Sequence, residues 1–368
     1  MVEYLVFLII STGVFALFSL GLNLQWGFAG LINFGHVAFM TIGAYATVLL
    51  SSQGVPLIVA VMVGAAIAAL LGLLIGTSTL RLREDYLAIV TIGVSELLRL
   101  IALNEEWLTR GSFGVQNYPL PLENFQPNFL GKLIMIGLLT IFAIFASWQL
   151  SRGLRQEWNR QKKSPQLRKP IGPIVWGVIG AALILTVYIN ATIALYNYNY
   201  KAGLMLLVLL ALALAYWGLE FLVRSPWGRV IKAIREDEEI PKALGKNVFW
   251  YKLQAFMLGG AIAGVAGAFY AWQLTTVYPT NFEPIVTFNA WTIVVLGGAG
   301  NNAGTILGAI IFWAYDSLTR FILPQLGAID NAQLGAFRIM VIGLILMVLM
   351  VWRPQGILGK KEELTLGR

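Results

Sequence analysis

The sequence contains no cysteine, and His36 is the only histidine among its 368 residues. Without cysteine the chain can form no disulfide, no thiolate metal site and no cysteine nucleophile. A lone histidine also excludes a metal site with two histidine ligands. The sequence has no Gly-x-x-x-x-Gly-Lys-Ser/Thr string, which is the loop that binds phosphate in many ATPases. These absences disfavour an enzyme and indicate that the chain does not itself hydrolyse ATP.

Charge is also scarce, since 12% of the residues are charged and 58% are hydrophobic. A soluble globular domain usually has about 25% charged residues. The hydrophobic residues form long blocks, several of them close to the ~20 residues that cross a bilayer. The chain is therefore predicted to be an all-α integral membrane protein with about ten or eleven transmembrane segments. The predicted segments are 4–24, 28–50, 55–80, 86–103, 131–150, 173–193, 203–223, 254–275, 303–323 and 336–352, with a shorter one near 286–298.

The basic residues are distributed unevenly along the predicted topology. Four stretches that share one side of the membrane contain 20 of the 26 lysines and arginines: residues 81–83, 152–169, 224–252 and 353–368. By the positive-inside rule this side is cytoplasmic, so the N-terminus faces out and the C-terminus faces in. The formal charge of +8 thus reflects membrane topology, and no nucleic-acid partner is expected. The loop 151–172 is interpreted as a solvated basic stretch close to the lipid.

A second cytoplasmic loop, 224–253, mixes charged and apolar residues at helical spacing. Pro226 stands near its start and Gly245 near its end, as is common at helix termini. Its apolar residues, Val230, Ile231, Ile234, Ala243 and Leu244, predict a short amphipathic helix on the membrane surface.

Two glycine-rich breaks interrupt the apolar pattern, at residues 23–36 and 296–304. Transporters use such breaks because free backbone groups are tolerated at membrane depth only where they are buried or line a cavity. We expect these breaks to lie beside a pathway lined by neutral polar groups, namely Asn33, His36, Asn301 and Asn302. The alternatives are ordinary turns for the breaks and a purely structural role for His36.

Charged residues inside spans require partners. Glu96 and Arg99 are three residues apart, and Asp316 and Arg320 are four apart, so each pair can neutralise itself on one helix face. Alternatively, both pairs could line a hydrated passage of an ion- or proton-coupled secondary transporter or channel. A membrane enzyme centred on His36 is a weaker alternative. Glycines at four-residue spacing favour close helix packing: Gly300, Gly304 and Gly308, and Gly260 and Gly264, with Gly267 beyond.

Several strings carry a resemblance to a known family. Residues 27–39, followed by Gly43-Ala44-Tyr45, resemble the first signature of the LivM-type permeases, which belong to ABC importers of branched-chain and neutral amino acids. Matching strings follow in the same order at 83–91, 235–245, 296–300 and 353–359. The loop 151–172 departs from the pattern because LivM-type chains typically shorten or lack it.

The resemblance implies a LivM-like ABC permease fold, with a single transmembrane domain over residues 1–368 in the bacterial cytoplasmic (inner) membrane. It also implies an importer that contains a second, LivH-type permease, two cytoplasmic ATPases that bind ATP and magnesium, and an external solute-binding protein. No cofactor is expected on this chain, and urea is an alternative substrate. The surface segment then resembles a coupling helix that docks on an ATPase, with these residues: Arg229, Ile231, Ile234, Arg235, Glu236, Asp237, Ala243, Leu244 and Gly245.

Overall fold

The computed structural model describes residues 2–80, 84–163, 171–325, 331–352 and 355–359. The regular structure in these ranges is helical, and strand-like pairing is limited to one isolated bridge between Val115 and Val277. The predicted all-α class is confirmed. The helices are α1 (Val2–Leu22), the π-helix η1 (Asn23–Phe28), α2 (Val37–Ser52), α3 (Leu57–Thr79), α4 (Glu84–Asn104), α5 (Glu106–Thr109), the 3-10 helix η2 (Gly111–Phe113), α6 (Phe129–Lys163), α7 (Ile171–Tyr196), α8 (Tyr200–Arg224), α9 (Pro226–Glu236), α10 (Glu239–Ala243), α11 (Val248–Leu274), the 3-10 helix η4 (Pro279–Phe282), α12 (Ile285–Gly297), α13 (Asn302–Gln325) and α14 (Asn331–Trp352).

Each predicted apolar segment overlaps a helix, but the helices differ in length. Within the described ranges six helices are long and apolar enough to cross a membrane, or seven if α12 and α13 are one broken span. Three shorter apolar stretches are α2 (Val37–Ser52), Gly180–Tyr196 within α7 and Gly335–Ile345 within α14. The predicted ten or eleven crossings are reached only if these are counted as well. The segment predicted to begin at residue 28 begins at Val37 instead, because Asn23–Phe28 continues the preceding helix as η1.

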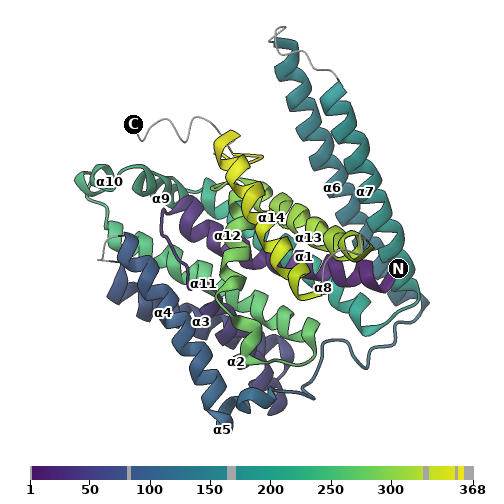
Figure 1. Ribbon diagram of the computed structural model, residues 1–368, viewed down its shortest axis with the longest axis horizontal. Coiled ribbons are helices and arrows are strands. Elements are labelled where there is room, and N and C mark those ends of the chain that lie inside the picture. The colour runs from purple at the N-terminus through teal and green to yellow at the C-terminus, as the bar shows by residue number, and fades with distance from the viewer. Residues whose placement is uncertain (1, 81–83, 164–170, 326–330, 353–354, 360–368) are drawn as a thin grey trace. The chain divides into compact units, whose positions relative to one another are not determined.

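The chain divides into two compact units. The first contains residues 1–9 and 121–207, and its main feature is the pair of long helices α6 and α7, which run side by side in Figure 1. The two helices are joined by a hydrogen bond of 3.0 Å between the hydroxyls of Thr140 and Tyr188. The second unit contains residues 10–120 and 208–368 and holds both glycine-rich breaks. The single permease domain stays a prediction.

Helices α2, α3 and α11 pack closely in the second unit, where Figure 1 shows α3 and α11 together. A Cβ atom on Gly43 would lie 2.1 Å from the Gly264 carbonyl oxygen, and one on Gly267 would lie 2.1 Å from that of Met40. Small residues at these positions let the helix backbones approach. The predicted packing role of the spaced glycines is therefore confirmed for Gly264 and Gly267.

The chain bends by 117° between α12 and α13, across a short break. With 13 residues, α12 is about 20 Å long, which is less than the ~30 Å of the hydrocarbon core. The two helices nevertheless pack tightly beside the bend, because a Cβ atom on Gly297 would lie 2.0 Å from the Gly304 carbonyl oxygen. Gly298 ends α12 with a φ of 110°, a conformation that favours glycine.

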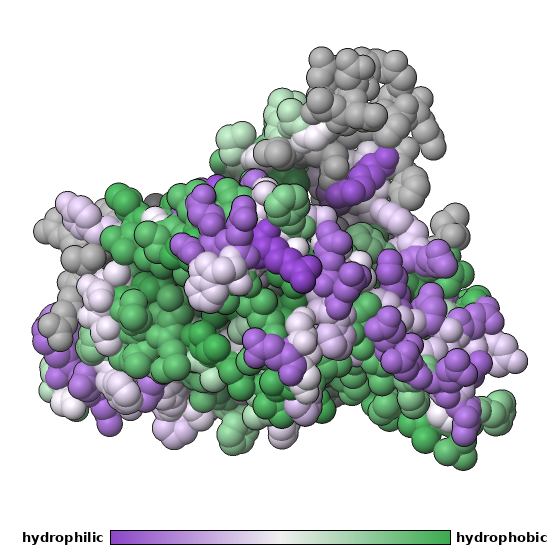
Figure 2. Space-filling model, turned by 90° about the horizontal axis from the view of Figure 1, so that it is seen from below, coloured by the Kyte–Doolittle hydropathy of each residue, from purple (hydrophilic) through white to green (hydrophobic). Residues whose placement is uncertain are grey.

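Hydrophobic residues cover much of the face drawn in Figure 2, between smaller hydrophilic patches. On α3 alone, Ile58, Met62 and Leu74 are each more than 60% exposed. Such apolar exposure is far beyond what a soluble monomer presents. With the long apolar helices, it identifies a multi-pass membrane protein.

Candidate functional site

The two glycine-rich breaks contact each other through Asn23 on η1. The Asn23 side-chain nitrogen donates to the Asn302 side-chain oxygen at 3.1 Å. Its oxygen accepts from the Gly300 backbone nitrogen at 2.9 Å. Asn23 and Asn302 are almost completely buried. Segments nearly 280 residues apart in sequence are thus joined by two hydrogen bonds, one buried and one partly buried.

The contact extends to a carboxylate on α8. The Asn302 side-chain nitrogen donates to Glu220 at 3.2 Å, and Glu220 forms an ion pair of 2.7 Å with Arg224. The neighbouring Asn301 accepts from the Gly304 backbone nitrogen at 3.0 Å, which caps the start of α13. The side-chain amides of Asn301 and Asn302, in the second break, therefore both have hydrogen-bond partners within the chain.

A parallel network holds the first break. Gln25 donates to the Phe256 carbonyl oxygen on α11 at 2.8 Å and accepts from the Asn33 side chain at 2.8 Å. The Asn33 side-chain oxygen accepts from the Gly35 backbone nitrogen at 2.9 Å. Its backbone carbonyl accepts from the indole nitrogen of Trp291 on α12 at 3.0 Å. Asn33 is therefore connected to both sides of the junction between the breaks.

His36 lies in the interior, with no exposed surface. Its ring packs against Phe18 and Phe39, at centroid distances of 4.7 and 5.6 Å. Its Nε2 atom is 3.1 Å from the Phe18 carbonyl oxygen, whereas its Nδ1 atom has no hydrogen-bond partner. This environment favours the structural interpretation of His36.

All four predicted pathway residues make structural contacts within the chain, and among them the Asn302 side chain joins the two breaks through Asn23. Direct contact with a transported solute stays a prediction for Asn33, His36, Asn301 and Asn302. The sequence assigned no bridging role to Asn23, Gln25, Glu220 or Trp291. Their signal is visible in retrospect: polar side chains inside apolar runs must find partners at membrane depth.

Four aromatic side chains gather beside the junction. The Trp291 ring lies 4.4 Å from that of Trp26 and 5.0 Å from that of Phe34, and Phe34 stacks on Phe288 at 5.6 Å. Trp26, Phe34 and Trp291 are half-buried and Phe288 is exposed. The junction therefore presents an apolar aromatic surface next to its buried amides.

Helix α9 is attached to the end of η1. Ser225 accepts a hydrogen bond at its N-terminus and Pro226 occupies the first helical position, which fixes where the helix begins. Arg235 donates to the Gly27 carbonyl oxygen at 2.5 Å, and the Lys232 ammonium lies 5.5 Å from the centre of the Phe28 ring. Cations at this position complement the negative end of the helix dipole.

The predicted amphipathic helix is divided in two. Helix α9 ends at Glu236, and α10 begins at Glu239 after Asp237 accepts a hydrogen bond from the Glu239 backbone nitrogen. The apolar residues of the two helices face different environments. Ile231 and Ile234 are buried within the protein, whereas Ile240 and Leu244 are 59% and 74% exposed.

The remaining predicted coupling residues lie around this junction. Arg229, Glu236, Asp237 and Ala243 are exposed, and Gly245, with a φ of 73°, follows α10. The ATPase-coupling role of this set stays a prediction, but Ile231 and Ile234 are buried in this chain and do not expose their apolar side chains. They anchor α9 inward because burying an aliphatic side chain is favourable. The sequence pattern could not distinguish a face directed to a partner from one directed to the protein's own interior.

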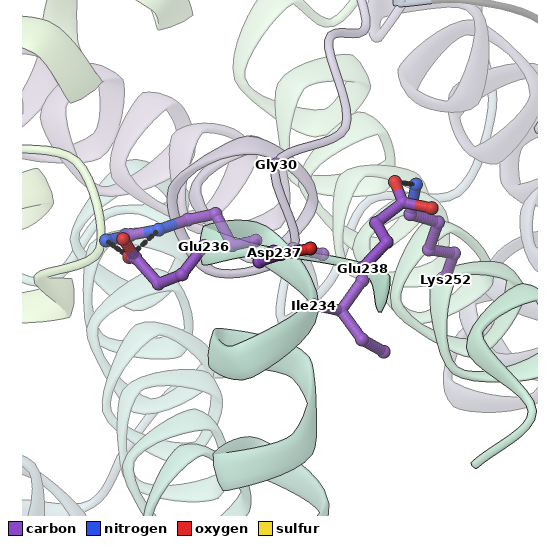
Figure 3. A pocket seen from close by; sticks show the side chains of 8 residues that line it. Gly30, Ile234, Glu236, Asp237, Glu238 and Lys252 are labelled. Carbon is purple, nitrogen blue, oxygen red and sulfur yellow. Dashed lines mark hydrogen bonds and ion pairs between the residues drawn. The ribbon is translucent and has the colours of Figure 1, made fainter. Parts of the chain in front are cut away.

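A polar pocket of about 180 Å³ lies where α9 and α10 meet the chain after η1. Figure 3 shows Glu238 and Lys252 pointing toward each other at one side of it, near Gly30. At the other side Arg235 pairs with Glu236 at 2.6 Å. The charges lining the pocket largely neutralise one another. Among the residues that the structure describes, no group of three histidine, aspartate or glutamate side chains could hold a metal ion.

Both charge pairs predicted within spans form locally. Arg99 donates to Glu96 at 2.9 and 2.5 Å, and Arg320 donates to Asp316 at 2.9 Å. The prediction of local neutralisation is confirmed for both pairs.

These features define a helical membrane protein with two interrupted helices that meet at their breaks. The chain belongs to the family described as the permease component of the branched-chain amino acid transport system, which matches residues 4–350. This result confirms the predicted LivM-type resemblance.

Individual relatives agree with the family match. The chain is 29% identical to the high-affinity branched-chain amino acid transport system permease protein LivM of Escherichia coli K12, over 94% of this chain and 68% of that protein. It is 23% identical to the probable LivM of Methanocaldococcus jannaschii, over 96% and 92% of the two chains. It is 28% identical to LivH of Escherichia coli K12, over 39% and 42%. No solved structure matches the chain.

Proposed function

We propose that this chain is a permease subunit of an ATP-driven ABC importer for branched-chain and other neutral amino acids. The observation that carries the proposal is the family match over residues 4–350. The names of its relatives, which are branched-chain amino acid transport permeases, indicate the class of substrate. The sequence has no phosphate-binding loop, so ATP with magnesium would be bound by other subunits.

The partners of this importer would be a LivH-type permease, two cytoplasmic ATPases and an external solute-binding protein. Similarity of the chain to both LivM and LivH relatives supports a pair of related permeases. The importer would lie in the bacterial cytoplasmic membrane. The uneven distribution of lysine and arginine supports an external N-terminus and a cytoplasmic C-terminus.

The ATPase would dock on α10 rather than on the buried face of α9. Ile240 and Leu244 expose apolar surface there, and Lys242 and Glu239 form an exposed ion pair beside them. An apolar centre with a charged rim is the usual composition of a protein interface. Helix α9 would then transmit movement inward, since Arg235 binds the end of η1.

The solute pathway would run between the two permeases, along the junction of the breaks. The aromatic side chains Trp26, Phe34 and Trp291 offer an apolar surface suited to aliphatic side chains. Asn33, His36, Asn301 and Asn302 stay the proposed polar residues beside this pathway. Specificity would come mainly from the external binding protein.

The proposal is tested by purifying the tagged chain from native membranes and by measuring uptake in vesicles that contain all co-purifying subunits. We expect a second permease and two ATPases to co-purify, and leucine uptake to require ATP. Urea and a cationic amino acid serve as competing solutes. Urea uptake alone would assign the other substrate, and ATP-independent uptake by the isolated chain would establish a secondary transporter instead.

A further inference from the structure

The string that closes the resemblance to the family, at 353–359, has a definite place in the fold although no role was assigned to it. Its described part, Gln355–Gly359, lies against the carboxyl end of α12. The backbone nitrogens of Ile357 and Leu358 donate to the carbonyl oxygens of Leu296 and Gly297, both at 3.0 Å. We call Gln355–Gly359 the C-terminal strap.

The strap is also attached to the second break by a side chain. The Asn301 amide nitrogen donates to the Leu358 carbonyl oxygen at 2.8 Å, while the amide oxygen caps α13 through Gly304. One asparagine thus joins the strap to the start of α13. The strap therefore contacts both helices of the bent pair.

Glycines allow the backbones of the strap and of the end of α12 to touch directly. A Cβ atom on Gly356 would lie 2.5 Å from the Gly298 Cα atom, and one on Gly298 would lie 2.6 Å from the Gly359 nitrogen. Gly298 and Gly356 both have positive φ values, 110° and 75°, and both are buried. Only glycine combines this conformation with such an approach.

The backbone hydrogen bonds from the strap satisfy carbonyl groups that the end of α12 would otherwise leave without partners. The last carbonyl groups of a helix have no partner within the helix. A buried backbone group without a hydrogen-bond partner costs about 1–3 kcal/mol. Helix α12 ends at the break, and the strap supplies N–H groups to two of its last carbonyl oxygens, those of Leu296 and Gly297. The strap therefore completes the end of α12.

We propose that the C-terminal strap positions the α12–α13 break permanently and moves with the two helices as one body during transport. Two backbone bonds, one side-chain bond and the glycine contact favour a fixed attachment over a gate that opens in each cycle. The uptake part of the test rests on the proposed importer function, whereas the cross-linking part does not.

The chain has no cysteine, so an engineered pair reports the attachment without background. Ala299 and Leu358 flank the Gly298–Gly359 contact, and Leu358 is exposed. The double variant Ala299→Cys/Leu358→Cys in membrane vesicles should cross-link within the chain, and each single variant should not. ATP-driven leucine uptake should persist after cross-linking. Loss of uptake that returns on reduction would show that the strap must release, and would overturn the proposal.

A backbone variant tests whether the attachment matters. Ile357→Pro removes the N–H group that binds Leu296, and Ile357→Val keeps it. We expect the proline variant, in the cysteine-pair background, to cross-link poorly. At equal amounts in the membrane, we expect its initial uptake to fall at least about fivefold, and the valine variant to match the parent. A second pair provides a check on folding: Gly356→Ala should behave like the proline variant, whereas Gly343→Ala, with open space around it, should not.

The outcomes separate the two proposals. Normal cross-linking and normal uptake in Ile357→Pro would refute the proposed role of the C-terminal strap. Absence of any amino-acid uptake by the parent importer would refute the proposed function, while the cross-linking yields would still decide whether the strap is attached.

Discussion

Removal of the Asn23 side chain tests whether the two breaks are energetically coupled. In Asn23→Ala the Gly300 backbone N–H and the Asn302 side-chain oxygen lose their partner. The Asn302 side chain is buried and Gly300 is half-buried, so both groups are wholly or partly shielded from water. Asn302→Ala removes one of the same two bonds and also the bond to Glu220.

The expected magnitude follows from the number of groups left without partners. Each buried polar group that loses its hydrogen bond costs about 1–3 kcal/mol, although single hydrogen bonds between transmembrane helices contribute only ~0.6 kcal/mol on average. We therefore expect Asn23→Ala to lower the free energy of unfolding by about 2–4 kcal/mol. The double variant should be less destabilised than the sum of the singles, by about 0.5–2 kcal/mol, because the bond between Asn23 and Asn302 is counted twice in that sum.

The free energy of unfolding is measured in mixed micelles by titration with sodium dodecyl sulfate, with tryptophan fluorescence as the signal. Asn190→Ala is the control, because Asn190 donates an exposed bond to the Thr186 carbonyl within its own helix, and it should change stability by less than about 0.5 kcal/mol. Additivity of Asn23→Ala and Asn302→Ala to within about 0.3 kcal/mol would refute the coupling.

Three further variants probe packing, docking and the lone histidine. Gly43→Ala should lower the free energy of unfolding by about 1–3 kcal/mol, because α2 and α11 must separate to admit the methyl group. Gly93→Ala is the control, since no atom lies near its Cβ position, and it should not be destabilised. Equal stability of the two variants would contradict the close packing of α2 on α11. Leu244→Asp should reduce co-purification of the ATPases about tenfold and Leu244→Met should not, since a charge in the centre of an apolar interface is costly; unchanged recovery would place docking elsewhere. His36→Ala should destabilise the protein by about 2–4 kcal/mol, because the ring that packs between Phe18 and Phe39 is lost. Uptake per folded molecule should fall only partly. A stable variant without any uptake would give His36 a direct role in transport.

The sequence predicted the features that depend on local composition. Runs of apolar residues identify helices because the bilayer selects for them over about 20 residues at a time. The glycine-rich strings at 23–36 and 296–304 were also recognisable, and so were the charge pairs three and four residues apart. In each case the informative residues are neighbours in the sequence or on one helix turn.

Contacts between distant segments could not be predicted in the same way. Nothing in the residues around Asn23 specifies Gly300 as its partner, because that pairing depends on how whole helices pack. Helical periodicity likewise showed that Ile231 and Ile234 share a face, but not that this face is turned inward. The C-terminal strap was recognisable as a string and not as a partner of α12, because its backbone hydrogen bonds carry little side-chain signature.

The contacts of Arg235 suggest how a force on the surface could reach the breaks. Ile240 and Leu244 expose apolar surface in and directly after α10, whereas Ile231 and Ile234 anchor the neighbouring α9. Arg235 on α9 donates to the Gly27 carbonyl at the end of η1. Four residues earlier in the same turn of η1, Asn23 binds Gly300 of the second break. A displacement of α9 must therefore move η1 or break the bond to Gly27.

We expect Arg235→Lys to separate ATP hydrolysis from transport. A lysine keeps the charge but lacks the planar group that binds Gly27 and Glu236 together. The ATPases should still co-purify and hydrolyse ATP, because the exposed residues of α10 are unchanged, while the amount of leucine imported per ATP should fall severalfold. Arg229→Lys is the matched control, since Arg229 is exposed and makes only a long contact with the Arg224 carbonyl. An unchanged ratio of leucine to ATP in Arg235→Lys would mean that movement reaches the breaks by another route.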